Sequence, residues 1–170
     1  MKEYSNIEID RLIQCEKVVI EPPKRQMRRD RGSLRNDFKM RSDQFDGEFI
    51  AFLRINERFP ENFSIGLEYV PKGEKGDIIL MRCNGPHGPY LDEQQGMVSS
   101  PHKSFHIHKA KSENIESGFR PERGGTATTE YACFEEALRF FLREIHLQSP
   151  EECFPGINQM IFDFMNSKES

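Results

Sequence analysis

The chain has 170 residues, of which 36% are hydrophobic and 31% are charged, and its net charge at pH 7 is −4. This length is typical of one domain that buries about 70% of its unfolded surface, so we expect a single domain spanning residues 1–170. The absence of an apolar run of about 18 residues, and of an apolar leader behind the acidic N-terminus, argues against a membrane span and a secretory signal. The four cysteines form no CxxC pair, so we expect free thiols in a cytoplasmic protein.

An N-terminal helix is the first expected element. Ser5 and Glu8 have the spacing of a capping box, and Ile9, Leu12 and Ile13 form an apolar stripe at helical spacing. The EPP sequence at 21–23 cannot continue a helix, so the element is expected to end before it.

A basic segment follows at 24–41, where eight basic residues stand against two acidic ones. Such a segment suits an arm that contacts phosphates, although a solvated loop or a contact for an acidic protein explains it as well. The candidate nucleic-acid-binding residues are Lys24, Arg25, Arg28, Arg29, Arg31 and Arg35.

The middle of the chain predicts strands. Within the basic segment, Phe38 and Met40 alternate with charged residues, as on a half-buried strand. The segments EFIAFLRIN (48–56), FSIGLEYV (63–70) and DIILMRCN (77–84) follow one another through short turns, and SFHIHKA (104–110) comes after a Gly- and Pro-rich loop at 85–101. Together they predict an antiparallel sheet of about five strands.

The C-terminal part, 133–167, has helical periodicity. One expected helix is EEALRFFLREI, and a last helix would place Ile157, Met160, Ile161 and Phe164 on one face, after a break at SPEECFPG. A second long loop, which could be mobile, is expected at 111–129. We therefore predict an α+β fold in which the N-terminal helix and two C-terminal helices pack mainly on one face of the sheet.

Four of the five histidines, His87, His102, His106 and His108, lie within 22 residues, in the histidine-rich region 84–109. On a strand, residues i and i+2 point to the same side, so His106 and His108 should share the face opposite Phe105 and Ile107. If the strands at 77–84 and 104–110 pair, the loop between them brings His87 close to this pair.

Converging imidazoles support two chemistries. His87, His106 and His108 with a water would form an open tetrahedral zinc site. Alternatively, two imidazoles cleave a phosphodiester without metal, with a cation stabilising the phosphorane. The catalytic candidates on this hypothesis are His87, His106, His108, Arg82, Asn84 and Lys109, with Lys103 as a further cation.

The absence of an acidic residue directly beside His106 and His108 favours the chemistry without a cofactor. A metal-bound histidine usually donates its second nitrogen to such a partner. Asp92 and Glu93 in the loop are the nearest acids that could serve.

Several motifs resemble a loose group of small uncharacterised bacterial proteins. These are RCNGPHG, HKSFHIHKA, TTEY and CFEEALRFFLREI, and their layout is also similar to that of the TumE-like toxins of toxin–antitoxin loci. The resemblance covers roughly residues 63–147 and implies that Asn84, His87, His106 and His108 are signature positions. The chain departs from the pattern in a longer loop before the HxH strand and in Cys133, a poorer N-cap than serine.

Three functions follow as hypotheses. The first is a toxin-like, RNA-directed enzyme that uses the histidines for acid–base catalysis. The second is a non-enzymatic module that engages RNA or an acidic protein through the basic segment. The third is a metal-dependent hydrolase. Against all three stands a purely structural interpretation, in which the histidines hydrogen-bond to stabilise a loop.

Overall fold

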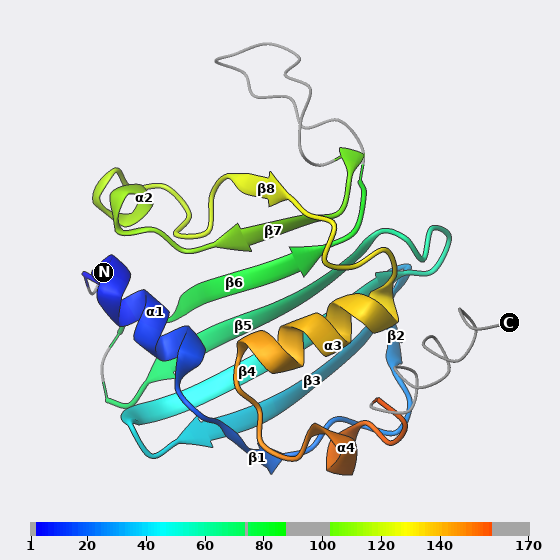
Figure 1. The fold of residues 1–170 in the computed structure, drawn as a ribbon, viewed down its shortest axis with the longest axis horizontal. Helices are drawn as coiled ribbons and strands as arrows, with labels where there is room; N and C mark the ends of the chain where they lie inside the picture. The colour runs from blue at the N-terminus through cyan, green and yellow to red at the C-terminus, as the bar shows by residue number, and fades with distance from the viewer. Residues whose placement is uncertain (1–2, 74, 88–102, 158–170) are drawn as a thin grey trace, which may run out of the picture.

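The computed structural model describes residues 3–73, 75–87 and 103–157, and its elements follow the chain in the order shown in Figure 1. The helices are α1 (Asn6–Gln14), α2 (Ser112–Glu116), α3 (Phe134–Glu144) and α4 (Pro150–Cys153). The strands are β1 (Val18–Glu21), β2 (Arg28–Asp30), β3 (Ser33–Ser42), β4 (Phe45–Asn56), β5 (Phe63–Pro71), β6 (Ile78–Asn84), β7 (His106–Lys109) and β8 (Gly125–Ala127). Among the described helices, none is long and apolar enough to cross a membrane.

The strands form one antiparallel sheet in the order β1-β3-β4-β5-β6-β7-β8, with β2 paired to β3. The prediction of an α+β fold with an antiparallel sheet is confirmed, but the count of about five strands is wrong, because the described residues form eight. The five expected strands correspond to β3–β7. The others, β1, β2 and β8, have only three or four residues each, too few to show a period in the sequence.

Alternation along the long strands separates a core face from an opposite face. Phe49, Ala51 and Leu53 of β4 are buried and pair in register with Tyr69, Leu67 and Ile65 of β5. Helices α1, α3 and α4 lie on this face of the sheet, as Figure 1 shows. Helix α3 buries Ala137, Leu138, Phe141 and Leu142 against it.

The start of α1 follows the expected capping pattern. The Ser5 hydroxyl accepts from the backbone N–H of Glu8, and the Glu8 carboxylate accepts from the backbone N–H of Ser5. By contrast, Cys133 caps α3 without a side-chain hydrogen bond, as expected of a poor N-cap.

A buried lysine joins the ends of two helices beneath the sheet. Lys17 is fully buried, and its Nζ donates to the carbonyl oxygens of Ile13 at 2.8 Å, Cys15 at 2.8 Å and Ile145 at 3.1 Å. The ammonium group also lies 4.6 Å from the centroid of the Phe49 ring. Lys17 therefore satisfies carbonyls that the last turns of α1 and α3 leave without partners.

Three expectations for the C-terminal half differ from the structure or lie outside the described residues. The segment 111–129, expected as one long loop, contains α2 and β8. The expected break at SPEECFPG contains the short helix α4. Of the last expected helix, only Ile157 is described, so this prediction lies outside the described residues.

Candidate functional site

The pairing of β6 with β7 places four polar side chains on the face of the sheet away from α1 and α3. Arg82 lies opposite His108 and Asn84 lies opposite His106 in the register of the two strands. Residues directly opposite each other in an antiparallel pair point to the same side. The predicted pairing of the two strands, and the shared face of the HxH histidines, are thus confirmed.

Three imidazoles converge at this position. The ring centroids of His87 and His106 are 5.0 Å apart, and those of His106 and His108 are also 5.0 Å apart, with edge-to-face angles of 72° and 71°. His87 reaches His106 from the turn after β6, as the sequence predicted. His102 lies outside the described residues.

Main-chain carbonyls fix the orientation and the tautomer of two rings. Nδ1 of His106 lies 2.8 Å from the carbonyl oxygen of Ser104, and Nδ1 of His108 lies 3.0 Å from that of Glu122. A carbonyl oxygen only accepts, so each Nδ1 carries a proton and donates it. In the neutral form of each ring, Nε2 is then the basic nitrogen.

An asparagine faces the basic nitrogen of the central ring. Nδ2 of Asn84 lies 3.5 Å from Nε2 of His106, at the limit of a hydrogen bond. The Asn84 amide is oriented by Ser64, whose hydroxyl donates to Oδ1 at 2.8 Å. This orientation turns the amide N–H groups toward the imidazoles.

The cluster is more buried than the sequence indicated. His106 is 0% exposed and His108 is 5% exposed, whereas His87 is half-buried. His106 and His108 share the predicted face of the sheet, but they are buried on that face instead of being exposed to solvent. Both rings lie beneath neighbouring groups, and His87 is the ring nearest to solvent.

Two glycines near the cluster lie where a side chain would meet close neighbours. A Cβ at Gly125, on β8, would lie 3.0 Å from Cδ2 of His106 and 3.1 Å from Cε1 of His108. A Cβ at Gly85 would lie 1.7 Å from the carbonyl oxygen of Glu61, so only glycine fits in the turn that leads to His87.

A buried ion pair borders the cluster at His108. Arg82 Nη2 lies 2.9 Å from a carboxylate oxygen of Glu122, which is 2% exposed. Burial lowers the pKa of the Arg82 guanidinium, and Glu122 opposes that shift. Glu122 therefore makes two contacts with the cluster: its carboxylate pairs with Arg82, and its carbonyl accepts from Nδ1 of His108.

The other predicted cations do not join the cluster. Lys109 follows His108 on the strand and so points to the opposite face, where its Nζ lies 2.6 Å from Asp10. This placement contradicts a role for Lys109 beside the imidazoles. Lys103 is exposed on the segment that precedes β7.

A tyrosine from the opposite face ties the two strands together. The Tyr131 hydroxyl donates to the carbonyl oxygen of His106 at 2.7 Å and lies 3.3 Å from that of Asn84. Burial, reinforced by the nearby Cys83, raises the pKa of Tyr131 above its usual value, so the hydroxyl stays protonated and able to donate. The same burial raises the pKa of the Cys83 thiol to about 12.

The basic segment is part of the sheet and lies apart from the imidazoles. Its strands β2 and β3 are separated from β7 by β4, β5 and β6, four strand spacings on the order of 19 Å. Arg29 pairs with Glu57 at 2.8 Å and Arg35 with Asp30 at 3.1 Å. These contacts compensate part of the charge that the sequence assigned to phosphate binding. Lys24, Arg25, Arg28 and Arg31 are exposed.

The described residues contain no group of three His, Cys, Asp or Glu side chains that could hold a metal ion. The metal site formed by His87, His106 and His108 is therefore not supported by the geometry of these residues. Asp92 and Glu93, the acids considered as orienting partners, lie outside the described residues.

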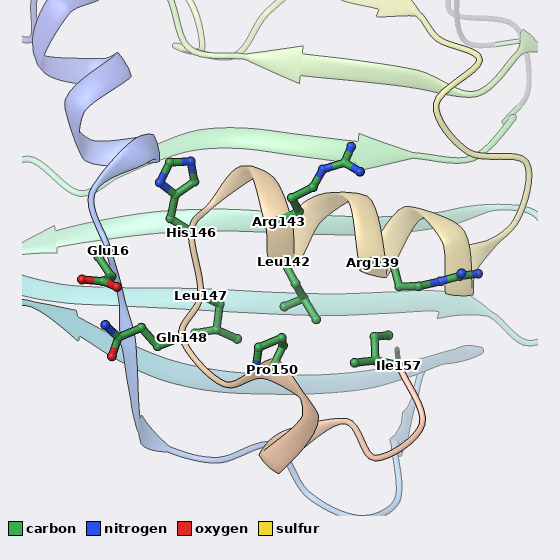
Figure 2. A pocket seen from close by; sticks show the side chains of 9 residues that line it. All are labelled: Glu16, Arg139, Leu142, Arg143, His146, Leu147, Gln148, Pro150 and Ile157. Atoms are coloured by element: carbon green, nitrogen blue, oxygen red, sulfur yellow. The ribbon is translucent and has the colours of Figure 1, made fainter. Parts of the chain in front are cut away.

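A cavity of about 610 Å³ lies elsewhere, beside α3 on the helix-covered side of the sheet. Figure 2 shows Leu142, Leu147 and Pro150 near one another, with the side chains of Arg143 and His146 extending away from them. Arg143 also lies within ion-pair distance of Glu130 and Glu144. The polar groups of this cavity do not converge, so the imidazole cluster is the better candidate site.

Sequence reasoning missed Glu122, Tyr131, Ser64 and Gly125. Glu122 and Tyr131 are far from the histidines in the sequence and join them only through the pairing of β7 with β8 and the packing before α3.

Comparison with known proteins identified no relative: no family model, no curated protein and no solved structure matches the chain.

Proposed function

We propose that this protein is a metal-free acid–base enzyme that cleaves phosphodiester bonds in RNA at the cluster of His87, His106 and His108. The observation that carries the proposal is the pair of 5.0 Å ring separations, which bring three titratable groups to one point. General acid–base catalysis needs one group that accepts a proton and another that returns it, both beside the reacting atoms.

RNA supplies its own nucleophile for such a site. His106 is buried, so RNA would approach it from the side of His87, the ring of the three that is nearest to solvent. Nε2 of His106 then takes the proton of the 2′-hydroxyl, whose oxygen bonds to phosphorus. The P–O5′ bond breaks as protonated His87 gives its proton to the leaving 5′-oxygen. The products are a 2′,3′-cyclic phosphate and a 5′-hydroxyl, and the next proton exchange with water restores both imidazoles.

The remaining polar groups suit the charge that develops on phosphorus. The Asn84 amide N–H groups face the cluster and can donate to a phosphorane oxygen. His108 supports the edge of the His106 ring and is itself held by the Glu122 carbonyl. Arg82 is compensated by Glu122, so we assign it a positioning role.

The test is cleavage of single-stranded RNA oligonucleotides of mixed sequence in the presence of a chelator. His87→Ala removes the proposed acid. His106→Asn keeps a donor for the Ser104 carbonyl but removes the basic nitrogen, so the fold is retained while the base is lost. Each variant should lower the cleavage rate roughly a hundredfold to ten-thousandfold. The free energy of unfolding of the same variants, measured with urea, should fall by about 1–3 kcal/mol, with a single cooperative transition retained.

Two controls accompany this experiment. An oligonucleotide with 2′-deoxyribose throughout should stay intact, because it has no nucleophile. His146→Asn, at an exposed histidine after α3 whose φ of 51° asparagine tolerates, should cleave like the wild type. Intact RNA with the wild-type protein, or equal rates in the wild type and His106→Asn, would overturn the proposal.

A further inference from the structure

The segment 117–124, between α2 and β8, is anchored by several hydrogen bonds. The Asn114 amide donates to the carbonyl oxygens of Pro121 at 2.8 Å and Arg123 at 3.0 Å. The backbone N–H of Phe119 donates to Asn114, and that of Lys111 donates to Pro121. A segment fixed in this way presents its side chains without a large entropic cost on binding.

The side chains that this segment turns outward are aromatic and cationic. Phe119 is 48% exposed, and the guanidinium carbon of Arg123 lies 4.0 Å from its ring centroid. Arg120 is exposed beside them. The one acidic residue of the segment, Glu122, is buried against Arg82, so the outer side carries positive charge beside a ring.

This surface adjoins the imidazole cluster. The Glu122 carbonyl accepts from His108, so the segment is bonded directly to one of the three rings. Arg120 lies near enough to Arg82 to contribute to lowering its pKa. Figure 1 shows the chain between α2 and β8 running beside the end of β7.

We propose that Phe119, Arg120 and Arg123 bind single-stranded RNA beside the histidine cluster, with one unpaired base stacked on Phe119 and a neighbouring phosphate bound by Arg120. The inference rests on the proposed RNA cleavage and deepens it, because it names the form of the substrate. Base stacking on an aromatic ring requires a base that is free of its partner strand, and a guanidinium stacked on the same ring extends the platform. Double-stranded RNA offers no such base.

The experiment measures binding separately from cleavage. A fluorescein-labelled single-stranded 2′-O-methyl oligonucleotide, which lacks the nucleophile, is titrated with protein and followed by fluorescence anisotropy. Phe119→Ala should weaken binding roughly fivefold to a hundredfold, whereas Phe119→Tyr should keep it. Arg120→Ala should weaken binding and lower the slope of log K against log salt by about 0.7. The matching duplex should bind more weakly than the single strand.

Ile20→Ala is the matched control, because Ile20 is a large apolar residue, 46% exposed, on β1 at the far edge of the sheet. It should bind like the wild type. The inference is overturned if the wild type does not bind the oligonucleotide, or if Phe119→Ala and Ile20→Ala bind equally well. Binding that depends on Phe119 without cleavage of RNA by the wild type would sustain this inference and reject the proposed enzyme. Cleavage that depends on His106 but not on Phe119 would sustain the proposed enzyme and reject this inference.

Discussion

The two faces of the sheet each bury cationic or titratable side chains, but they use them differently. On the helix-covered face, Lys17 gives its three ammonium hydrogens to three carbonyl oxygens. On the opposite face, His106 and His108 each use Nδ1 to hold a main-chain carbonyl, which makes Nε2 the basic nitrogen. The donors of Lys17 are all used by the fold, whereas Nε2 of His106 is a basic nitrogen that faces the Asn84 amide within the cluster.

Removal of Lys17 should produce the largest loss of stability. Lys17→Met keeps roughly the length of the side chain but removes the ammonium donor from the carbonyl oxygens of Ile13, Cys15 and Ile145. We expect the free energy of unfolding to fall by about 2–4 kcal/mol, measured by urea denaturation. Lys72→Met is the control. Lys72 is exposed, and its one ion pair among the described residues, with Asp46, is long at 4.0 Å. This variant should therefore change the free energy of unfolding by about 0.5 kcal/mol at most. Equal stability of Lys17→Met and the wild type would contradict the structural role of the lysine.

The pH dependence of stability sharpens the same contrast. Burial lowers the pKa of Lys17 to about 8, against about 10.4 in an unfolded chain. Between these values the unfolded state binds more protons than the folded state, so stability due to Lys17 should rise with pH by up to about 3 kcal/mol from pH 8 to 10.5. The raised pKa of Cys83 acts in the opposite direction above about pH 8.5.

The difference between the wild type and Lys17→Met isolates the lysine, because the contribution of Cys83 is common to both proteins. The measurement is a series of urea denaturation curves at pH 7 to 10.5 for the two proteins. The wild type should gain stability relative to the variant across this range. A difference that stays constant with pH would show that the ammonium group is not desolvated.

A smaller effect on stability is expected at the imidazole cluster. Gly125→Ala adds a methyl group against His106 and His108, so both rings must move by a few tenths of an ångström. The imidazole resonances of the two histidines should shift in NMR spectra, while stability falls by about 1 kcal/mol. Thr126→Ala, next on β8 and facing the other side, should leave these resonances in place. Unshifted rings in Gly125→Ala would show that β8 does not pack against them.

The sequence predicted the parts of the fold that depend on long periodic segments. The strands β3–β7 and the helices α1 and α3 each repeat an apolar pattern over several residues, so their type could be recognised. The strands β1, β2 and β8 could not be recognised, because a strand of three or four residues is too short to show an apolar period and forms by pairing with a longer neighbouring strand. The role of Lys17 was hidden for a similar reason, since its partners are carbonyls from the ends of two helices.

The candidate site was predictable in its residues but not in its support. The HxH spacing and the turn at Gly85 are enough to predict that His87 lies near His106, as the ring separation confirms. The orienting groups are main-chain carbonyls, which leave no mark in the sequence, so the spacing of acidic side chains around His106 and His108 does not reveal them. The burial of His106 also depends on contacts from distant parts of the chain.

The use of carbonyls to set the two tautomers also bears on how this site can evolve. A carbonyl oxygen is the same in every amino acid, so the orientation of the His106 ring does not depend on which side chain stands at position 104. At position 122 the side chain contacts Arg82, whereas the contact with His108 is made by the carbonyl. Both contacts that set the tautomers are therefore made by the backbone. Substitutions at positions 104 and 122 that preserve the path of the backbone leave these contacts in place.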